Sequence, residues 1–478
     1  MGMQEWMETL ARERAASLAM GGPEAVKQQH ALGRLTVRER VSKLFDPNSF
    51  VELGMLARAQ DPALDAVTPA DGLITGLGKV NGVGAAVVAE DATVLDHTDA
   101  QVAAIKRTRL LEVAVQSGWP LIFLADRGQG RAAVSADPRF GGSAPREPEM
   151  KIGLWPNTAV AAVMGNCFGA SATRVTAADL LVMVKGAYLR LEGPLQTVEN
   201  VRFHAEVSGV VDRVAQDDEE ALELLKRFVG YLPPNAALRP PRTKSGDSAE
   251  RLLTEAAAQV PQDLEKPYDI RPLIHMLCDH NSFFALKPDY APNLVTGLAR
   301  LDGHTIGVIA SQPLVNKGAI DGAAVHKALR LARLCRRFRL PVLFVQDTPG
   351  YAASSPADER DLLTATRELV QTIIEVQAPK LVLVLRRGHV LGEFALGGRQ
   401  LGVDYIAAWP LAEIPTVEPL GFAATPTPPA NERLGPWPAA DAALIEDVLE
   451  PAETRRRLSQ FLELAIVKRD LPGVSPAP

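Results

Sequence analysis

Two short segments place an acid and turn residues directly after an apolar run. Residues 341–352 read PVLFVQDTPGYA and residues 120–132 read PLIFLADRGQGRA, so Asp347 and Asp126 each follow an expected buried strand. After Asp347 the chain continues with Thr348, Pro349 and Gly350, which are expected to form a turn. Acids and tight turns at the carboxyl ends of strands are where α/β sheets build their sites. Both segments are therefore predicted to mark the edge of a site.

Each of these turns is followed by another apolar run that enters a glycine-containing loop. The first loop, CFGAS, contains Gly169 and Ala170, and the second, RRGHVLGE, covers residues 386–393. A glycine loop that opens a helix exposes backbone N–H groups, which can stabilise a carbonyl oxygen that gains negative charge. A single loop of this kind more often only lets a strand and a helix pack closely. The occurrence of both loops at matching distances favours the chemical role.

The two sets of motifs belong to an internal repeat. Asp126 and Asp347 lie 221 residues apart, and the same offset places ITGLGKVNG at residues 74–82 over VTGLARLDG at residues 295–303 without a gap. Shared apolar composition does not explain gap-free agreement over such a length. The chain is therefore predicted to be a duplication.

Both copies predict the same order of elements. Two strands joined by a tight turn, as in GLARLDGHTIGVIASQ, lead to a segment with apolar residues at helical spacing and then to a short apolar strand. Helices between short, doubly apolar strands imply a sheet covered on both faces. The predicted fold class is α/β, with two domains at residues 1–240 and 241–478.

Composition excludes several classes of function. The 478 residues, 47% of them apolar and 23% charged, are typical of a globular enzyme with two large domains. The net charge of −6 and the scattered basic residues give no nucleic-acid footprint. No window reaches the roughly 18 apolar residues of a membrane span, and no targeting segment is evident, so a cytoplasmic location is expected. Three widely spaced cysteines predict neither disulfides nor a zinc site, and no metal is expected.

A set of longer segments resembles a known family. The segments are GRLTVRERVSKLFDPNSFVELG, TPADGLITGLGKVNG, PYDIRPLIHMLCDHNSFF, the run from SQPLVNKGAIDG through VQDTPGY, AAWPLAEI and IEDVLEPAETRRRL, and also FHAEVSG around His204. With them the chain resembles the carboxyltransferase β subunits of biotin-dependent acyl-CoA carboxylases, the propionyl-CoA and methylcrotonyl-CoA carboxylase group. The resemblance spans nearly all of residues 33–458. It implies two tandem crotonase-like (ClpP/crotonase) domains related by internal duplication.

The resemblance also implies a reaction at a site shared by two chains. Acyl-CoA would be held by the first domain of one chain, and biotin, on a biotin carboxyl carrier subunit or domain charged by biotin carboxylase, would reach the second domain of another. In such enzymes carboxybiotin releases CO2, biotin removes a proton beside the thioester, and the enolate attacks CO2. A homo-oligomer, from a dimer to a hexamer, is the expected assembly. No side-chain nucleophile is required.

Backbone amides hold the two oxyanions in this family. The first pair maps onto Gly169 and Ala170, for the thioester oxygen, and the second onto Leu391 and Gly392, for the ureido oxygen of biotin. The residues expected to bind biotin are Asp347, Thr348, Pro349, Gly350, His389 and Val390. Two further residues of the second loop, His389 and Glu393, could act as acid or base, although a loop histidine is more often simply packed or hydrogen-bonded.

A repeated pair of basic residues permits two interpretations. Lys106 and Arg109 lie three residues apart on one expected helix face, and Lys327 and Arg330 repeat them. They could meet the phosphates of CoA. The competing interpretation is a solvated helix face.

Two alternatives to carboxyl transfer remain open at this stage. In the second loop Val390 and Leu391 stand where relatives have glycines, and a side chain there takes up space and disfavours positive φ. A crotonase-fold enzyme that hydrolyses or decarboxylates CoA thioesters without biotin is one alternative. A non-catalytic subunit of a carboxylase assembly is the other.

Overall fold

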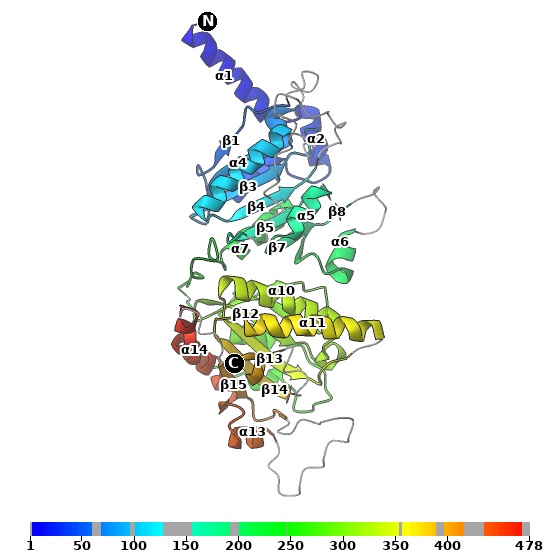
Figure 1. Ribbon diagram of the computed structural model, residues 1–478, viewed down its shortest axis with the longest axis vertical. Helices are drawn as coiled ribbons and strands as arrows, with labels where there is room; N and C mark the ends of the chain where they lie inside the picture. Colours follow the sequence, from blue (N-terminus) through cyan, green and yellow to red (C-terminus); the bar gives the residue numbers. More distant parts are fainter. Residues whose placement is uncertain are drawn as a thin grey trace. The chain divides into compact units, whose positions relative to one another are not determined.

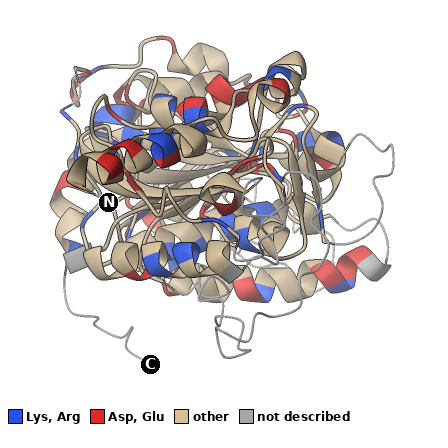
Figure 2. Ribbon diagram, turned by 90° about the horizontal axis from the view of Figure 1, so that it is seen from above, with Lys and Arg blue, Asp and Glu red and all other residues tan. Residues whose placement is uncertain are grey.

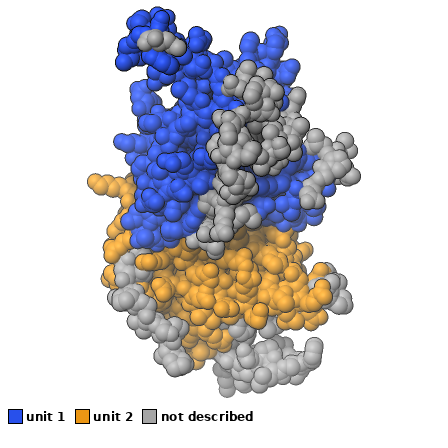
Figure 3. Space-filling model, turned by 45° about the horizontal axis from the view of Figure 1, so that its top comes forward, with its two compact units in different colours: residues 1–238 blue, residues 239–478 orange. Residues whose placement is uncertain are grey.

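The computed structural model describes residues 2–59, 68–95, 101–127, 155–191, 200–244, 246–352, 356–388, 396–414 and 435–470. The chain divides into two compact units, residues 1–238 and residues 239–478 (Figure 3). Each unit contains a seven-stranded sheet of its own. None of the described helices is long and apolar enough to cross a bilayer.

The sheet of unit 1 begins with antiparallel pairing and continues as a parallel sheet. Its strands, in spatial order, are β1 (Val51–Leu53), β2 (Leu73–Val80), β3 (Val83–Glu90), β4 (Leu121–Ala125), β5 (Ala159–Val163), β7 (Leu180–Val184) and β9 (Arg213–Ala215). The first two pairs are antiparallel and the other four are parallel. Two short parallel strands, β6 (Asn166–Phe168) and β8 (Tyr188–Arg190), pair separately.

Unit 1 also contains helices that surround this sheet. They are α1 (Met3–Leu18), α2 (Pro23–Ala31), α3 (Val37–Leu44), η2 (Pro69–Gly72), α4 (Gln101–Ser117), α5 (Ala170–Thr176), α6 (Asn200–Arg202), the π-helix η5 (Phe203–Val207) and α7 (Asp218–Val229). Helix α4 packs on β2 and β3, and α7 packs on β5 and β7. The strands between them, LIFLA, AVAAV and LLVMV, are buried throughout, because a sheet covered on both faces needs unbroken apolar runs.

Unit 2 repeats the same sheet. Its strands, in spatial order, are β10 (Phe284–Leu286), β11 (Leu294–Leu301), β12 (His304–Ser311), β13 (Val342–Thr348), β14 (Lys380–Gly388), β15 (Tyr405–Ala408) and β16 (Asp447–Val448). The helices are α8 (Ala256–Gln259), α9 (Arg271–Leu277), η6 (Asn316–Gly318), α10 (Gly322–Phe338), α11 (Pro356–Ile374), η7 (Arg399–Leu401), α13 (Trp437–Asp441), η8 (Pro451–Glu453), α14 (Thr454–Ala465) and η9 (Ile466–Asp470). Helices α10 and α11 lie side by side, and α10 packs on β11 and β12 (Figure 1).

The strand registers confirm the predicted duplication. Thr75 faces Val88 in unit 1, and Thr296 faces Ile309 in unit 2, each 221 residues further along. The same offset still relates the first register pair of β4 and β5 to that of β13 and β14. Beyond β5 and β14 the spacing between strands differs in the two copies. The α/β class and the order of two strands, helix and strand in each copy are therefore confirmed.

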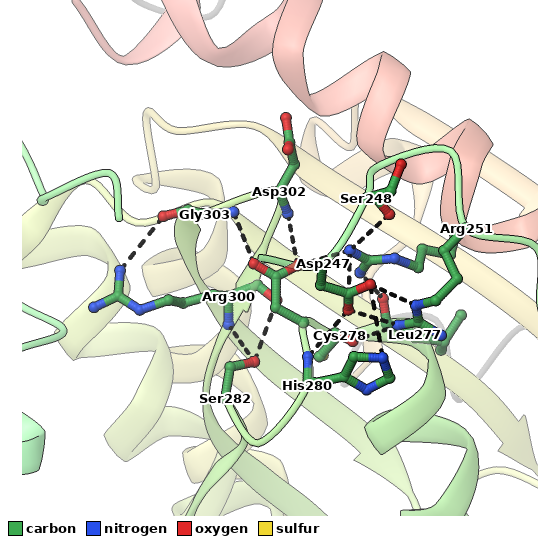
Figure 4. A network of polar contacts seen from close by, with 12 residues as sticks. Asp247, Ser248, Arg251, Leu277, Cys278, His280, Ser282, Arg300, Asp302 and Gly303 are labelled. Atoms are coloured by element: carbon green, nitrogen blue, oxygen red, sulfur yellow. Dashed lines mark hydrogen bonds and ion pairs between the residues drawn. The ribbon is translucent and has the colours of Figure 1, made fainter. Parts of the chain in front are cut away.

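In each unit an aspartate accepts hydrogen bonds from the turn between the second and third strands of the sheet. The two aspartates are not separated by 221 residues, and the sequence analysis missed them. In unit 2 Asp279 accepts the backbone N–H groups of Asp302 and Gly303 at 2.9 and 2.8 Å, and Ser282 bonds to the backbone of Arg300 (Figure 4). In unit 1 Asp46 accepts the N–H groups of the corresponding turn at 3.1 and 2.8 Å. The acids belong to the related stretches DPNSF and DHNSF, which lie 233 residues apart.

Residues of opposite charge alternate along many helices of the protein. On the face shown in Figure 2, Lys and Arg lie among Asp and Glu along the helices. This agrees with the scattered basic residues of the sequence.

The two repeated lysines do not lie on a solvated helix face, although Arg109 beside Lys106 is exposed. Lys106 and Lys327 are buried, and neither reaches a solvated face. The Nζ atom of Lys106 donates to the carbonyl oxygens of Ala70 and Leu73 at 2.7 and 2.5 Å. The Nζ atom of Lys327 donates to three carbonyl oxygens of the equivalent turn: those of Tyr290, Ala291 and Leu294. Each lysine therefore holds the chain where it enters the second strand of its sheet.

Replacing Lys106 with methionine should lower the free energy of unfolding by about 1 to 3 kcal/mol, because two buried carbonyls lose their donor. Burial lowers the pKa of Lys106 to about 8 from 10.5. The unfolded chain then binds more protons between these values, so the lysine's contribution makes stability rise with pH across that window. Urea denaturation at several pH values measures both effects. The exposed Arg109→Met variant is the control, and equal stability of the two variants would contradict the account.

Candidate active site

The first glycine loop connects β6 to α5. Gly169 adopts φ 55° and ψ −128°, a conformation that residues with a Cβ rarely reach. A Cβ placed on Gly169 would meet no atom of the described residues within 4 Å, so these residues leave the space beside the loop open. Ala170 is the first residue of the helix. An alanine is unstrained at that position.

The backbone N–H groups of this loop differ in their availability. The N–H of Gly169 donates to the carbonyl oxygen of Leu191 at 3.2 Å. The first bond along the helix runs from the N–H of Thr173 to the carbonyl oxygen of Gly169. Within the described part of the chain, the N–H of Ala170 has no hydrogen-bond acceptor. Of the two predicted oxyanion donors, the structure thus has the Ala170 amide free and the Gly169 amide engaged.

His204 supports the strand that runs beside this loop. Its Nε2 donates to the carbonyl oxygen of Leu189 in β8 at 2.9 Å, so its Nδ1 accepts the hydroxyl of Ser208 at 3.0 Å. Asn200 adds two further bonds to the backbone of Leu189. His204 lies in the π-helix η5, an element frequent at functional sites. Both of its ring nitrogens are engaged, which makes it a support rather than a base.

Two other groups beside the loop are also held in place. Cys167 is fully buried in β6, and burial raises the pKa of its thiol well above the usual range, so it is not a nucleophile. Arg127 donates to the carbonyl oxygen of Phe168 at 3.2 Å, with its guanidinium 5.4 Å from the ring centroid of Phe168.

The repeated acid of unit 2 is a buried anchor. Asp347 is 0% exposed and accepts the Nε groups of Arg386 and Arg387 at 2.6 and 3.2 Å. The Nη1 atom of Arg386 donates to three backbone carbonyls, and its guanidinium lies 4.7 Å from the ring centroid of Tyr268. The acid next to the end of β13 therefore serves to pair with two arginines at the end of β14.

The turn after Asp347 is satisfied within the protein. Thr348 is buried and accepts the N–H of Gly350 at 3.1 Å, while Gly350 has φ 111° and accepts the N–H of Ile320. Pro349 alone of the described turn residues is exposed. Two of the polar side chains expected to bind biotin, those of Asp347 and Thr348, are thus used to build the turn. A ligand at this edge would meet Pro349 and backbone groups.

Both flanks of the second glycine loop are tied to neighbouring backbone. Gly388 donates its N–H to the carbonyl oxygen of Glu413 at 3.0 Å. The Nε2 atom of Gln346 donates to the carbonyl oxygens of Leu396 and Gly397 at 3.0 and 2.6 Å. Sequence analysis missed Gln346, whose signal was a polar residue in an apolar strand. The predicted site residues of this loop lie outside the described residues: His389, Val390, Leu391, Gly392 and Glu393.

Unit 1 uses its repeated acid in the same way. Asp126 is buried and accepts Arg40 at 2.8 Å and Gln29 at 2.9 Å. Arg40 is itself buried and also bonds to Asp218 at 2.7 Å. The arginines come from different places, β14 in unit 2 and α3 in unit 1, so no common offset could reveal them.

Comparison with known proteins agrees with this geometry. The model of the family "Carboxyl transferase domain" matches residues 28–425. The propionyl-CoA carboxylase carboxyltransferase subunit of Haloferax mediterranei is 31% identical over 98% of this chain and 98% of its own. The methylmalonyl-CoA decarboxylase subunit alpha of Veillonella parvula is 28% identical over 98% and 97%.

Solved structures give the same result. The crystal structure of transcarboxylase 12S, a hexamer with hydrolysed methylmalonyl-coenzyme A bound, matches with a TM-score of 0.89 at 28% identity. The match covers 100% of this chain and 98% of that one. The resemblance noted in the sequence is confirmed, and the chain belongs to the carboxyl transferase family.

Proposed function

We propose that this protein is the carboxyltransferase subunit of an acyl-CoA carboxylase, acting at the α or vinylogous carbon of an acyl-CoA. The observation that supports this most directly is the free N–H of Ala170 beside the open space at Gly169. A thioester oxygen placed there would be stabilised as it gains negative charge. Gly169 would act as the second donor if the thioester oxygen replaces the carbonyl oxygen of Leu191 as the acceptor of its N–H.

The chain's own part in the reaction is to hold the acyl-CoA while its α carbon loses a proton and gains a carboxyl group. Biotin on a carrier supplies the carboxyl group and takes up the proton, so one N–C bond breaks and one C–C bond forms. The Ala170 N–H stabilises the enolate oxygen in between. In unit 2 we assign the equivalent role to Leu391 and Gly392, with His389, Val390 and the turn at residues 347–350 beside the biotin.

The described groups give no support to hydrolysis at the first loop. An esterase needs an activated nucleophile or a base that positions water. Cys167 is buried as a thiol, and both ring nitrogens of His204 are engaged. Carboxyl transfer needs neither group, so it fits the described residues better.

The proposed partners are a biotin carboxylase and a biotin carboxyl carrier, and the proposed location is the cytoplasm. The test is to supply carboxylated carrier with acetyl-, propionyl-, butyryl- and methylcrotonyl-CoA and to follow labelled carboxyl groups into the CoA ester. At least one ester should be carboxylated. If none is carboxylated while the esters still bind, the proposal is wrong.

Assembly provides a separate prediction. Three apolar side chains at or next to β8 and η5 are well exposed: Leu191 at 66%, Phe203 at 44% and Val207 at 65%. If such side chains form one contiguous patch, that patch marks an interface. Light scattering should show at least a dimer, up to a hexamer, and Val207→Asp should shift the mass downward. A stable monomer at micromolar concentration would remove the shared-site model.

A further inference from the structure

A buried carboxylate is tied to the first glycine loop. Glu90 ends β3, and its side chain is 4% exposed. Its Oε2 accepts the backbone N–H of Asp126 at 3.1 Å, and its Oε1 accepts the hydroxyl of Ser171. Ser171 directly follows Ala170 in α5. Glu90 therefore links the ends of β3 and β4 to the turn that carries the free Ala170 amide.

Charged and titratable groups from several elements face this carboxylate. They are Arg107 of α4, Asp126 and Arg127 after β4, Cys167 of β6 and Arg174 of α5. The Nη1 atom of Arg174 donates to the Ser171 hydroxyl oxygen at 3.0 Å and lies 3.8 Å from Oε1 of Glu90. Burial raises the pKa of Glu90 above its usual value, and the guanidinium groups of Arg174, Arg107 and Arg127 oppose that rise.

The duplicated unit shows which part of this arrangement is special to unit 1. Ser311 occupies the position 221 residues after Glu90, at the end of β12, and its hydroxyl oxygen accepts the N–H of Asp347 at 2.7 Å. Accepting the N–H of the repeated acid therefore requires only one oxygen. The second oxygen of Glu90 has a different use, which is to hold Ser171.

We propose that Glu90 is a positioning residue for carboxyl transfer, which fixes the Ala170 N–H at the thioester oxygen through Ser171. The inference rests on the proposed function of the first loop. As a carboxylate, Glu90 accepts from Asp126 and Ser171 at once. Protonation of one oxygen, or its replacement by the NH2 group of glutamine, turns that acceptor into a donor. The contact with Ser171 then has to rearrange.

The test is Glu90→Gln, which keeps the size of the side chain. We expect kcat to fall about tenfold at neutral pH with little change in the KM for acyl-CoA, because the amide acts on charge that develops only in the transition state. The wild-type kcat should also decline on acidification as Glu90 takes up a proton. That acid limb should be absent in the Glu90→Gln variant.

Two further measurements keep the inference testable if this variant folds poorly or the assay fails. Ser171→Ala removes the link without removing the charge and should lower kcat similarly. Hydrogen exchange of residues 170–176, which needs no substrate, should be faster in either variant than in the wild type. The control is Glu52→Gln in β1, the edge strand two positions from β3, where Glu52 pairs with Arg38 at 2.7 Å.

The outcomes separate this inference from the proposed function. A wild type that carboxylates no ester contradicts the proposed function, while hydrogen exchange still reports on Glu90. An active wild type whose acid limb survives unchanged in Glu90→Gln, with unchanged exchange in α5, overturns the inference alone.

Discussion

Replacing Ala170 with proline is expected to lower kcat for carboxyl transfer by about 10²-fold or more, the loss associated with removing one oxyanion donor. Proline lacks the N–H but suits the first position of a helix, where its fixed φ is already required. Ala170 occupies that position in α5. The substitution therefore removes the proposed donor with little damage to the fold. Steady-state kinetics with the best acyl-CoA measure the change.

The matched control is Ala170→Gly, which keeps the N–H and should retain most of the activity. Gly169→Pro is a poorer test, because Gly169 has φ 55° and proline cannot adopt it. A folded Ala170→Pro protein with wild-type kcat would show that this loop only packs the strand against the helix.

Removing the carboxylate of Asp347 should destabilise unit 2 by about 3 to 5 kcal/mol, because two buried guanidinium groups lose their counter-charge. Both Asp347 and Arg386 are 0% exposed. The Asp347→Ala variant should therefore unfold at a lower temperature or fail to accumulate, and calorimetry would record the shift. Activity should fall with it, since Arg386 and Arg387 lie at the end of the strand that leads into the second loop.

Two companion variants make this test specific. Asp361→Ala removes an exposed acid that pairs with His326 at 3.0 Å, and it should change stability by less than about 0.5 kcal/mol. An Asp347→Leu, Arg386→Met double variant should be more stable than Asp347→Leu alone, because it leaves one unpaired charge fewer. No difference between the single and double variants would mean that Asp347 does not stabilise the fold through Arg386.

Much of the fold was predictable because the duplication repeats locally encoded patterns. The apolar runs before Asp126 and Asp347 predicted buried strands, and the constant offset predicted matching registers, as Thr75 and Thr296 show. Lys106 was misjudged because helical spacing does not reveal how deeply a face is buried.

The surroundings of the site were less predictable. Arg40 comes from a helix far from Asp126 in sequence, and no pattern joins them. Glu90 ends β3, and no sequence pattern shows that its second oxygen reaches α5. Gly169 and Ala170 were found through the family resemblance, but which of their amides is free depends on the bond to Leu191. Contacts of this kind arise only from the assembled fold.

Carboxyl transfer can be followed in reverse, from a carboxylated CoA ester to free biotin. The carboxylated ester formed in the panel assay is incubated with the protein in the presence and absence of free biotin, and the decarboxylated ester, CO2 and free CoA are followed together. We expect the decarboxylated ester to form only when biotin is present, without release of CoA, and Ala170→Pro to lower its rate of formation by about 10²-fold or more. Release of free CoA, or decarboxylation at the same rate without biotin, would contradict carboxyl transfer to biotin.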